Sequence, residues 1–317
     1  MIDVYGVRMR VLVTGAAGWI GSAVVPELIG AGHEVTGLAR SDASAAALTK
    51  AGARVHRGDL DDLDGLRGVA GASDGVIHLA FNYDMVRSGD LQGAVDADRR
   101  AVEALGEALT GSDRPLVMAS VTLVLAPGRV GTELDAPSLD PADAGGPRAR
   151  LAPEQVALSF ASLGVRSSAV RLPPPVHGDG DHGSFLAGLI AIARAKGVSG
   201  FIGDGSQRWP AVHRLDAAHL FRLALEKAPA GSRLHAVADE GVPIRAIAEV
   251  IGRHLEVPVI SVPADEVNEH FGILAGFLAT DNPASSTLTR ELLGWQPTQP
   301  GLIEDLDKGH YFHGRSA

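Results

Sequence analysis

Short aliphatic runs alternate with Ala-rich segments of helical spacing along the first half of the chain. The aliphatic runs occur at residues 11–13, 35–38, 76–80, 116–119 and 168–172, and segments with helical spacing include residues 43–51 and 94–109. Alternation of this kind requires right-handed crossover connections, which build a parallel sheet covered by helices on both faces. The pattern therefore predicts a doubly wound α/β fold.

The alternation becomes irregular after about Arg171, where prolines at 173–175 and glycines at 178, 180 and 183 interrupt it. Further helices are predicted at residues 215–227 and 244–255, and no repeat, low-complexity tract or flexible linker separates the two halves. We therefore predict a first domain over residues 1–172 and a smaller C-terminal α/β region over residues 173–317. Segments near residues 208–236 are expected to return to the first domain.

Three glycines spaced by two residues follow the first predicted strand, in the sequence Thr14-Gly15-Ala-Ala-Gly18-Trp-Ile-Gly21. Gly15 permits a tight turn, Gly18 allows close approach of a pyrophosphate, and Gly21 allows the next helix to pack against the strand. A purely structural turn is the alternative. The strand–turn–helix context, with a second strand about 20 residues further on, favours a Rossmann dinucleotide site with phosphates at the helix N-terminus. The expected cofactor contacts are Gly15, Ala17, Gly18, Trp19, Ile20 and Gly21.

The end of the second predicted strand bears on which dinucleotide binds. NAD sites usually end this strand in a carboxylate that binds the ribose 2′-hydroxyl. Ala39 occupies that position here, and Arg40 and Ser41 follow it. Because a guanidinium group suits a 2′-phosphate, we predict NADP(H) as the preferred cofactor, held by Arg40 and Ser41. Asp42 keeps NAD(H) possible, and a solvated loop charge is the alternative interpretation of Arg40.

Several short motifs occur in an order that resembles the extended short-chain dehydrogenases/reductases, of the NAD(P)-dependent epimerase/dehydratase and 3β-hydroxysteroid-dehydrogenase-like kind. The motifs are the glycine turn, Gly58-Asp59-Leu60, His78-Leu79-Ala80, Arg171-Leu-Pro-Pro174, Val176-His-Gly178, Val212-His213-x-x-Asp216 and Leu293-Gly294-Trp295-x-Pro297. The resemblance implies a Rossmann fold whose C-terminal region binds substrate, and it implies a homodimer. It further implies cofactor contacts at Asp59, Leu60, Leu79, Ala80, Phe81 and Pro173.

The residue pair that normally carries the family's chemistry is missing. The family uses Tyr-x-x-x-Lys, in which tyrosinate moves the proton while lysine lowers its pKa and holds the nicotinamide ribose. None of the three tyrosines of the chain is followed by a lysine four residues later. The family's usual spacing back from Arg171 places Gly146 at the tyrosine position and Arg150 at the lysine position. Arg150 is therefore expected to bind the ribose, whereas Gly146 cannot transfer a proton.

Three side chains are candidates for the missing catalytic role. Ser120 and Thr122 follow the strand that normally carries the catalytic hydroxyl, and we predict that one of them contacts the substrate. The alternative is that these hydroxyls cap backbone groups. Tyr83 lies just past the strand end that faces the cofactor, where it is either a proton donor or an aromatic residue that lines the pocket.

The irregular region supplies the other candidate substrate contacts. His177 and Asp181 lie in a Gly-rich loop that can close over a substrate, and Arg208 and Trp209 offer a cationic fork and a flat apolar wall. Core packing is an equal alternative for Trp209. Few other basic residues lie near Arg208, which favours a neutral or apolar compound over a sugar nucleotide. The spacing of His177 and His182 is compatible with a metal site. No third ligand stands at a suitable spacing, so no metal site is predicted.

Composition and charge exclude several classes of protein. The formal net charge is −10 and no basic run occurs, which argues against nucleic-acid binding. No apolar stretch reaches the ~18 residues needed to cross a membrane, and residues 1–9 lack a signal-peptide core. The absence of cysteine excludes thiol chemistry and fits a reducing compartment. We therefore expect a cytoplasmic protein that acts on a small molecule.

Three functions are compatible with these residues. The first is an NADP(H)-dependent oxidoreductase acting on a small or apolar carbonyl or hydroxyl compound. The second is an epimerase or dehydratase that keeps its cofactor tightly bound. The third is a non-catalytic NAD(P)-binding regulator, which the missing tyrosine favours. The pocket-side sequence from Pro173 to Trp209 favours the oxidoreductase.

Overall fold

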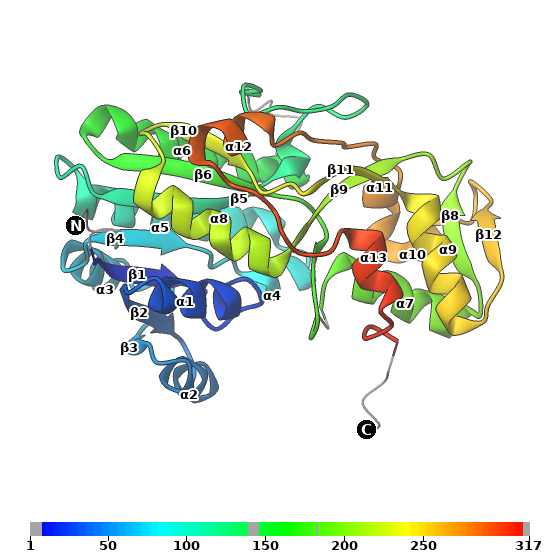
Figure 1. Cartoon of the computed structure of the whole chain (residues 1–317), viewed down its shortest axis with the longest axis horizontal. Coiled ribbons are helices and arrows are strands. Elements are labelled where there is room, and N and C mark those ends of the chain that lie inside the picture. Colours follow the sequence, from blue (N-terminus) through cyan, green and yellow to red (C-terminus); the bar gives the residue numbers. More distant parts are fainter. Residues whose placement is uncertain (1–7, 139–145, 182, 313–317) are drawn as a thin grey trace.

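The larger lobe is built on a seven-stranded parallel sheet (Figure 1). The structure, a computed structural model, describes residues 8–138, 146–181 and 183–312. The strands are β1 (Arg10–Thr14), β2 (Glu34–Ala39), β3 (Arg54–Arg57), β4 (Gly75–His78), β5 (Pro115–Val121), β6 (Arg166–Leu172) and β10 (Ser232–His235). They are hydrogen-bonded in the order β10-β6-β5-β4-β1-β2-β3, and every neighbouring pair is parallel. The order reverses between β1 and β4, which confirms the doubly wound Rossmann topology.

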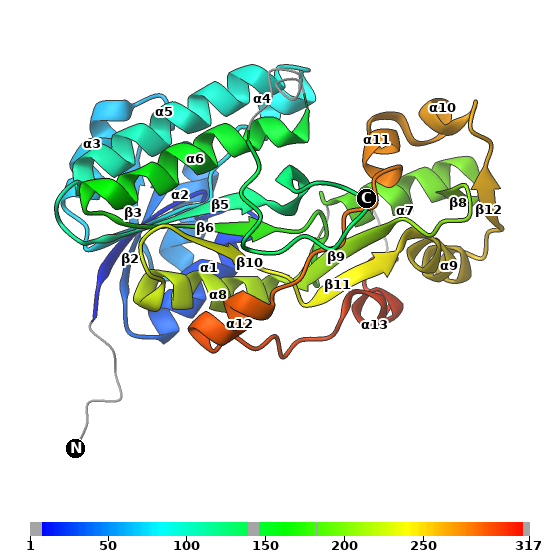
Figure 2. The same cartoon turned by 90° about the horizontal axis from the view of Figure 1, so that it is seen from above.

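Helices cover both faces of this sheet (Figure 2). One face carries α1 (Gly21–Gly30), α8 (Arg214–Lys227) and α12 (Thr287–Leu293), and the other carries α3 (Leu63–Gly71), α5 (Leu91–Leu109) and α6 (Leu151–Ser159). The remaining helices of this lobe are α2 (Asp42–Lys50) and α4 (Tyr83–Arg87), with 3₁₀ helices η1 (Thr122–Val124), η3 (Pro147–Arg150) and η4 (Phe160–Leu163). Strand β10 and helix α8 come from beyond residue 172, so the second half of the chain completes the large sheet.

The smaller lobe contains two short sheets packed against helices (Figures 1 and 2). Its strands are β7 (Val176–His177), β8 (Ser199–Ile202), β9 (Arg208–His213), β11 (Asp239–Pro243) and β12 (Val259–Val262). Its helices are α7 (Phe185–Lys196), α9 (Ile244–Leu255), α10 (Val267–Phe271), η5 (Gly272–Leu274), α11 (Ala275–Leu278) and α13 (Leu302–Asp307). One sheet has the order β11-β9-β7 and the other pairs β12 with β8. Across the described ranges, no helix has the length and apolar character needed to cross a bilayer.

Local sequence signals fix the ends of helices that border the two lobes. Ser184 accepts hydrogen bonds from the N–H groups of Leu186 and Ala187 and so begins α7. Gly197 ends the same helix in a left-handed conformation, with φ +68°, which glycine adopts without steric cost.

In the large sheet, β5 and β6 are almost continuously buried because helices cover both of their faces.

The segment 295–311 contacts both lobes, as its course in Figure 1 shows. Trp295 is fully buried, and its Nε1 donates to a backbone carbonyl of α8 at 3.0 Å. Further along, Asp305 Oδ2 lies 2.9 Å from His177 Nδ1. The Tyr311 hydroxyl accepts a hydrogen bond from the N–H of Gly178 at 2.9 Å. The loop that contains β7 is therefore held by residues more than a hundred positions later in the sequence.

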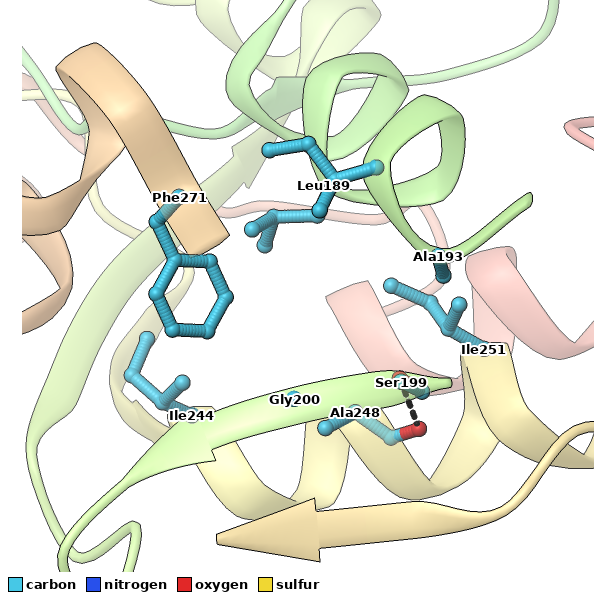
Figure 3. Close-up of a pocket in the computed structure, with 9 residues that line it drawn as sticks. Leu189, Ala193, Ser199, Gly200, Ile244, Ala248, Ile251 and Phe271 are labelled. Atoms are coloured by element: carbon cyan, nitrogen blue, oxygen red, sulfur yellow. Dashed lines mark hydrogen bonds between the residues drawn. The ribbon is translucent and has the colours of Figure 1, made fainter. Parts of the chain in front are cut away.

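The core of the smaller lobe surrounds Trp209, which has no exposed surface. Its Nε1 donates to the carbonyl of Phe277 at 3.2 Å, so the indole is packed and hydrogen-bonded. A cavity of about 10 Å³ lies in the same core, with Leu189, Ile244 and Phe271 among its lining (Figure 3). This volume is close to that of a single water molecule, so the cavity is a packing defect and not a ligand site.

Replacement of Trp209 by alanine is expected to lower the free energy of unfolding by about 3–5 kcal/mol, because it removes a large, fully buried side chain. Urea denaturation followed by circular dichroism measures this loss. Trp209→Phe keeps most of the apolar volume and should lose less. Unchanged stability of Trp209→Ala would contradict the assignment of this residue to the core.

Candidate cofactor and substrate site

A cleft of about 790 Å³ follows the carboxyl ends of the strands of the large sheet. Its walls come from the segments that follow β1, β2, β3 and β4, from the end of β5, and from the loop between β6 and α7. The cleft crosses the point where the strand order reverses, which is where ligands bind in open α/β sheets. Its volume is within the range of cofactor and substrate pockets.

The glycine turn, residues 15–21, packs so tightly that larger residues cannot replace Gly15 or Gly21. Gly15 has φ +66°, and a Cβ atom there would lie 2.7 Å from the backbone nitrogen of Ala80. A Cβ atom at Gly21 would lie 2.2 Å from the carbonyl oxygen of Gly15. No side chain caps the start of α1, and its first turn contains no acidic residue. The positive end of the helix dipole therefore faces a site suited to a phosphate.

At the β2 end of the cleft, Arg40 lines the wall beside Asp59 and Leu60. Arg40 Nη2 lies 2.8 Å from Asp84 Oδ2. Ser41 does not line the cleft; its hydroxyl accepts a hydrogen bond from Ser44 N at 3.2 Å and caps α2. Asp42 also lies off the cleft, where it forms an ion pair with Arg57. The first carboxylate after β2 is thus held away from the cleft.

Arg150 projects into the cleft from the turn that precedes α6. Its Nη1 donates to Asp98 Oδ2 at 3.0 Å and its Nη2 to the carbonyl of Ala119 at 2.9 Å, and the guanidinium carbon lies 3.9 Å from the ring centre of Phe81. Its Nε is buried and has no hydrogen-bond partner in the described part of the chain. The position predicted for a ribose-binding cation therefore holds a guanidinium group that is fixed at the cleft wall.

A buried chain of hydrogen bonds connects Arg150 to the glycine turn. Asp98 Oδ1 lies 2.9 Å from His78 Nε2, and His78 Nδ1 lies 2.8 Å from Thr14 Oγ1. Thr14 in turn accepts a hydrogen bond from the N–H of Ala80 at 3.3 Å. These contacts orient both ends of the cleft relative to each other.

Of the predicted catalytic residues, Ser120 and Tyr83 line the cleft and Thr122 does not. The Ser120 hydroxyl donates to Glu154 Oε2 at 2.5 Å. Glu154 has no exposed surface, and its other oxygen accepts from Arg171 Nη2 at 2.6 Å. Tyr83 is 61% exposed and packs edge-on against Phe81. Thr122 is fully buried in η1, so its hydroxyl does not reach the cleft.

The structure separates the predicted substrate residues. Asp181 lines the cleft, as does the predicted cofactor residue Pro173. His177, Arg208 and Trp209 do not line it. Arg208 Nη2 binds Asp281 Oδ2 at 2.8 Å, and Trp209 belongs to the core of the smaller lobe. These residues are placed by β7 and β9, whose side chains pack within the smaller lobe and against the segment 295–311.

Apart from Ser41, the predicted cofactor residues line the cleft. Sequence reasoning missed a further set of cleft residues that come from loop geometry and the starts of α4 and α7. His182 lies outside the described residues, and no group of three or more potential metal ligands occurs in the part of the chain that is described. The predicted residues that line the cleft include Gly15, Ala17, Gly18, Trp19, Ile20, Gly21, Leu79, Ala80 and Phe81, and the missed ones include Asn82, Asp84, Arg87, Val121, Leu123, Ser184 and Phe185.

His177 belongs to a buried cluster beneath the cleft loop. Its ring packs edge-on against His213, with ring centres 5.3 Å apart. Burial lowers the pKa of His213, and the neighbouring His177 lowers it further. The neutral ring of His213 accepts a hydrogen bond from Leu215 N at 3.2 Å through Nδ1 and so caps α8. Burial alone would raise the pKa of Asp305, but the hydrogen bond with His177 and the charges of His177, His310 and His213 together outweigh burial and lower it.

The fold and the cleft define a Rossmann-type protein. A model of the NAD dependent epimerase/dehydratase family matches residues 11–237, and the chain belongs to that family. The family accounts for the glycine turn and the strand order, and its members depend on NAD-type cofactors.

Similar proteins cover nearly the whole chain. An uncharacterized protein of Schizosaccharomyces pombe is 52% identical over 96% of this chain and 100% of its own length. The UDP-glucose 4-epimerase of Streptomyces lividans is 27% identical over 96% of this chain and 97% of its own. Among solved structures, MoeE5 in complex with UDP-glucuronic acid and NAD is 25% identical, with a TM-score of 0.71 over 94% of this chain and 96% of that chain.

Lowering the pH is expected to destabilise the protein through His213. Because the folded pKa of His213 is lowered, its contribution to stability is present above the ordinary histidine pKa of about 6.5 and is lost as the pH falls through the folded value. His213→Asn keeps an acceptor that can cap α8 but cannot titrate. The unfolding free energy of this variant, measured in urea between about pH 7 and pH 5, should therefore fall less steeply than that of the parent. Equal slopes would contradict this role.

Proposed function

We propose that this protein is an NADP(H)-dependent oxidoreductase that acts on a small neutral or apolar carbonyl or hydroxyl compound. The observation that carries the proposal is the β2 end of the cleft, where Arg40 lines the wall and Asp42, which pairs with Arg57 at the surface, does not. No carboxylate of the segment that follows β2 lines the cleft there, whereas a 2′-phosphate would find the guanidinium group of Arg40, which is paired with Asp84.

The residues of the cleft fit such a cofactor along its length. The glycine turn would hold the pyrophosphate, and Asp59 and Leu60 would contact the adenine. Arg150 lines the cleft as a fixed cation, which supports a role in binding the nicotinamide ribose. When bound, the nicotinamide supplies or accepts a hydride.

The lining of the substrate end supports a neutral substrate. Leu123, Leu172, Pro174, Val176 and Phe185 form much of this wall. The cation that the described lining provides there is Arg150, and Asp98 already neutralises it. A diphosphate group would find no uncompensated positive charge at this end. Sugar nucleotides, which occur in the names of several relatives, are therefore not the substrate class we propose.

Proton transfer is assigned to groups other than the missing tyrosine. Ser120 lies at the wall with its hydroxyl oriented by Glu154, and it would position the substrate oxygen. Tyr83 lines the same cleft and is the residue we propose as proton donor. Arg150 cannot take this role because a guanidinium group does not give up its proton in proteins.

A second candidate function is a non-catalytic NAD(P)-binding regulator. Gly146 stands where the family's spacing places the catalytic tyrosine, and it does not line the cleft. Retained nucleotide binding without turnover would result. An epimerase or dehydratase, the third possibility, would carry its cofactor through purification and show no net change in its absorbance.

Arg40→Ala is expected to weaken NADPH binding about tenfold to a hundredfold, because the charged hydrogen bonds to the 2′-phosphate are lost. NADH lacks this phosphate, so its affinity should change little. Isothermal titration calorimetry with both cofactors measures the difference. An equal loss for NADH and NADPH would remove the NADP(H) assignment.

Turnover can be measured as NADPH absorbance over a panel of ketones, aldehydes, steroids and imines. Ser120→Ala is expected to reduce the rate by about a hundredfold or more, because it removes the hydroxyl whose single proton, now donated to Glu154, would turn to the substrate oxygen. Its NADPH affinity should be unchanged, which shows that the site remains folded. Tight binding without turnover by the parent protein would favour the regulator.

A further inference from the structure

A carboxylate and two guanidinium groups meet at the β2 end of the cleft. Asp84 Oδ2 lies 2.8 Å from Arg40 Nη2, and Asp84 Oδ1 lies 2.5 Å from Arg87 Nη2. All three side chains line the cleft. Arg40 follows β2, whereas Asp84 and Arg87 lie one turn apart on α4, so the contact joins two segments far apart in the sequence. We refer to these three residues as the rim cluster.

The N–H donors of the rim cluster are arranged as in a phosphate site, but in this structure they bind a carboxylate. Two guanidinium groups approach the two oxygens of one anion, and each presents N–H donors. The pKa of Asp84 is lowered, first by its hydrogen bond with Arg40 and then by that with Arg87, which agrees with a carboxylate held between two cations. Arg87 carries no other hydrogen bond or ion pair to a described residue in this arrangement.

We propose that Arg87, beside Arg40, is the second ligand of the cofactor's 2′-phosphate. Asp84 occupies these two guanidinium groups when no cofactor is bound. This competition limits the preference for NADP(H) over NAD(H). The proposal rests on the proposed function, because it presumes that a dinucleotide lies along the cleft.

The exchange of one anion for the other is energetically accessible. The side chains of Arg40, Asp84 and Arg87 are 67%, 55% and 71% exposed, and ion pairs of this kind contribute little to stability. A phosphate monoester carries close to two negative charges near neutral pH and three acceptor oxygens, so it binds two guanidinium groups more strongly than one carboxylate does. After the exchange, the displaced carboxylate remains near the phosphate and repels it.

Asp84→Asn tests the competition, because it removes the charge with little change of shape. NADPH affinity, measured by calorimetry, is expected to rise about threefold to tenfold, while NADH affinity stays unchanged. Asp61→Asn is the matched control. Asp61 lines the same wall and lies 3.7 Å from Arg100, so its replacement removes an equal charge without touching the rim cluster. The control should raise the affinity for NADPH by less than twofold.

Arg87→Ala tests the second ligand. NADPH binding should weaken about tenfold and NADH binding should not change. Arg54→Ala is the matched control, since Arg54 is an exposed arginine at the start of β3 that does not line the cleft. If Asp84 acts through the two arginines, Asp84→Asn should have no effect on NADPH affinity in a protein that already carries Arg40→Ala and Arg87→Ala.

The outcomes separate this proposal from the proposed function. If Arg40→Ala weakens NADPH selectively but Asp84→Asn and Arg87→Ala leave NADPH affinity unchanged, the rim cluster proposal is wrong and the NADP(H) assignment stands. If Asp84→Asn weakens NADH instead, Asp84 is an acceptor for a ribose hydroxyl and the proposal is overturned. If Arg40→Ala weakens both cofactors equally, the NADP(H) assignment fails. Urea unfolding of each variant shows that the exposed substitutions leave the fold intact.

Discussion

The buried ion pair between Glu154 and Arg171 is the contact on which the arrangement of the cleft depends. Neither side chain has any exposed surface, and an unpaired charge at this depth would cost about 3–5 kcal/mol. The pair therefore fixes α6 against β6. Arg171 also donates to the carbonyl of Asp135 at 2.9 Å, and Glu154 accepts the hydroxyl proton of Ser120 in a hydrogen bond. One buried charge pair thus sets the position of the hydroxyl at the cleft wall.

Arg150 lies one helical turn before Glu154 and shows how the site differs from a typical family member. Its guanidinium group is held by Asp98 and stacked on Phe81, so it can bind and orient a ligand. It cannot serve as an acid or base at physiological pH. The family's lysine supports a tyrosine, whereas this arginine has only Gly146 at the tyrosine position. Under the proposed function, binding and proton transfer are therefore assigned to different segments of this chain.

The sequence predicts those parts of the structure that depend on neighbouring residues. The glycine turn and the strands near residues 11, 35, 116 and 168 follow from local spacing and burial, and the structure confirms them. The positions of Arg208 and His177 depend on Asp281 and Asp305, which are 73 and 128 residues away, and no local pattern indicates such partners. Sequence reasoning missed the rim cluster for the same reason, since Arg40 and Asp84 come into contact only when the fold places α4 next to the end of β2.

The contacts of the segment 295–311 also bear on the order in which the protein forms during synthesis. The large sheet receives its last strand by residue 235, so its strands are all available while later residues are still being added. The loop at residues 176–178 gains its partners from Asp305 and Tyr311, which emerge from the ribosome some 130 residues later. Domains generally fold from the N-terminus as the chain is made. The β7 side of the cleft is thus a part of this molecule that the nascent chain completes late.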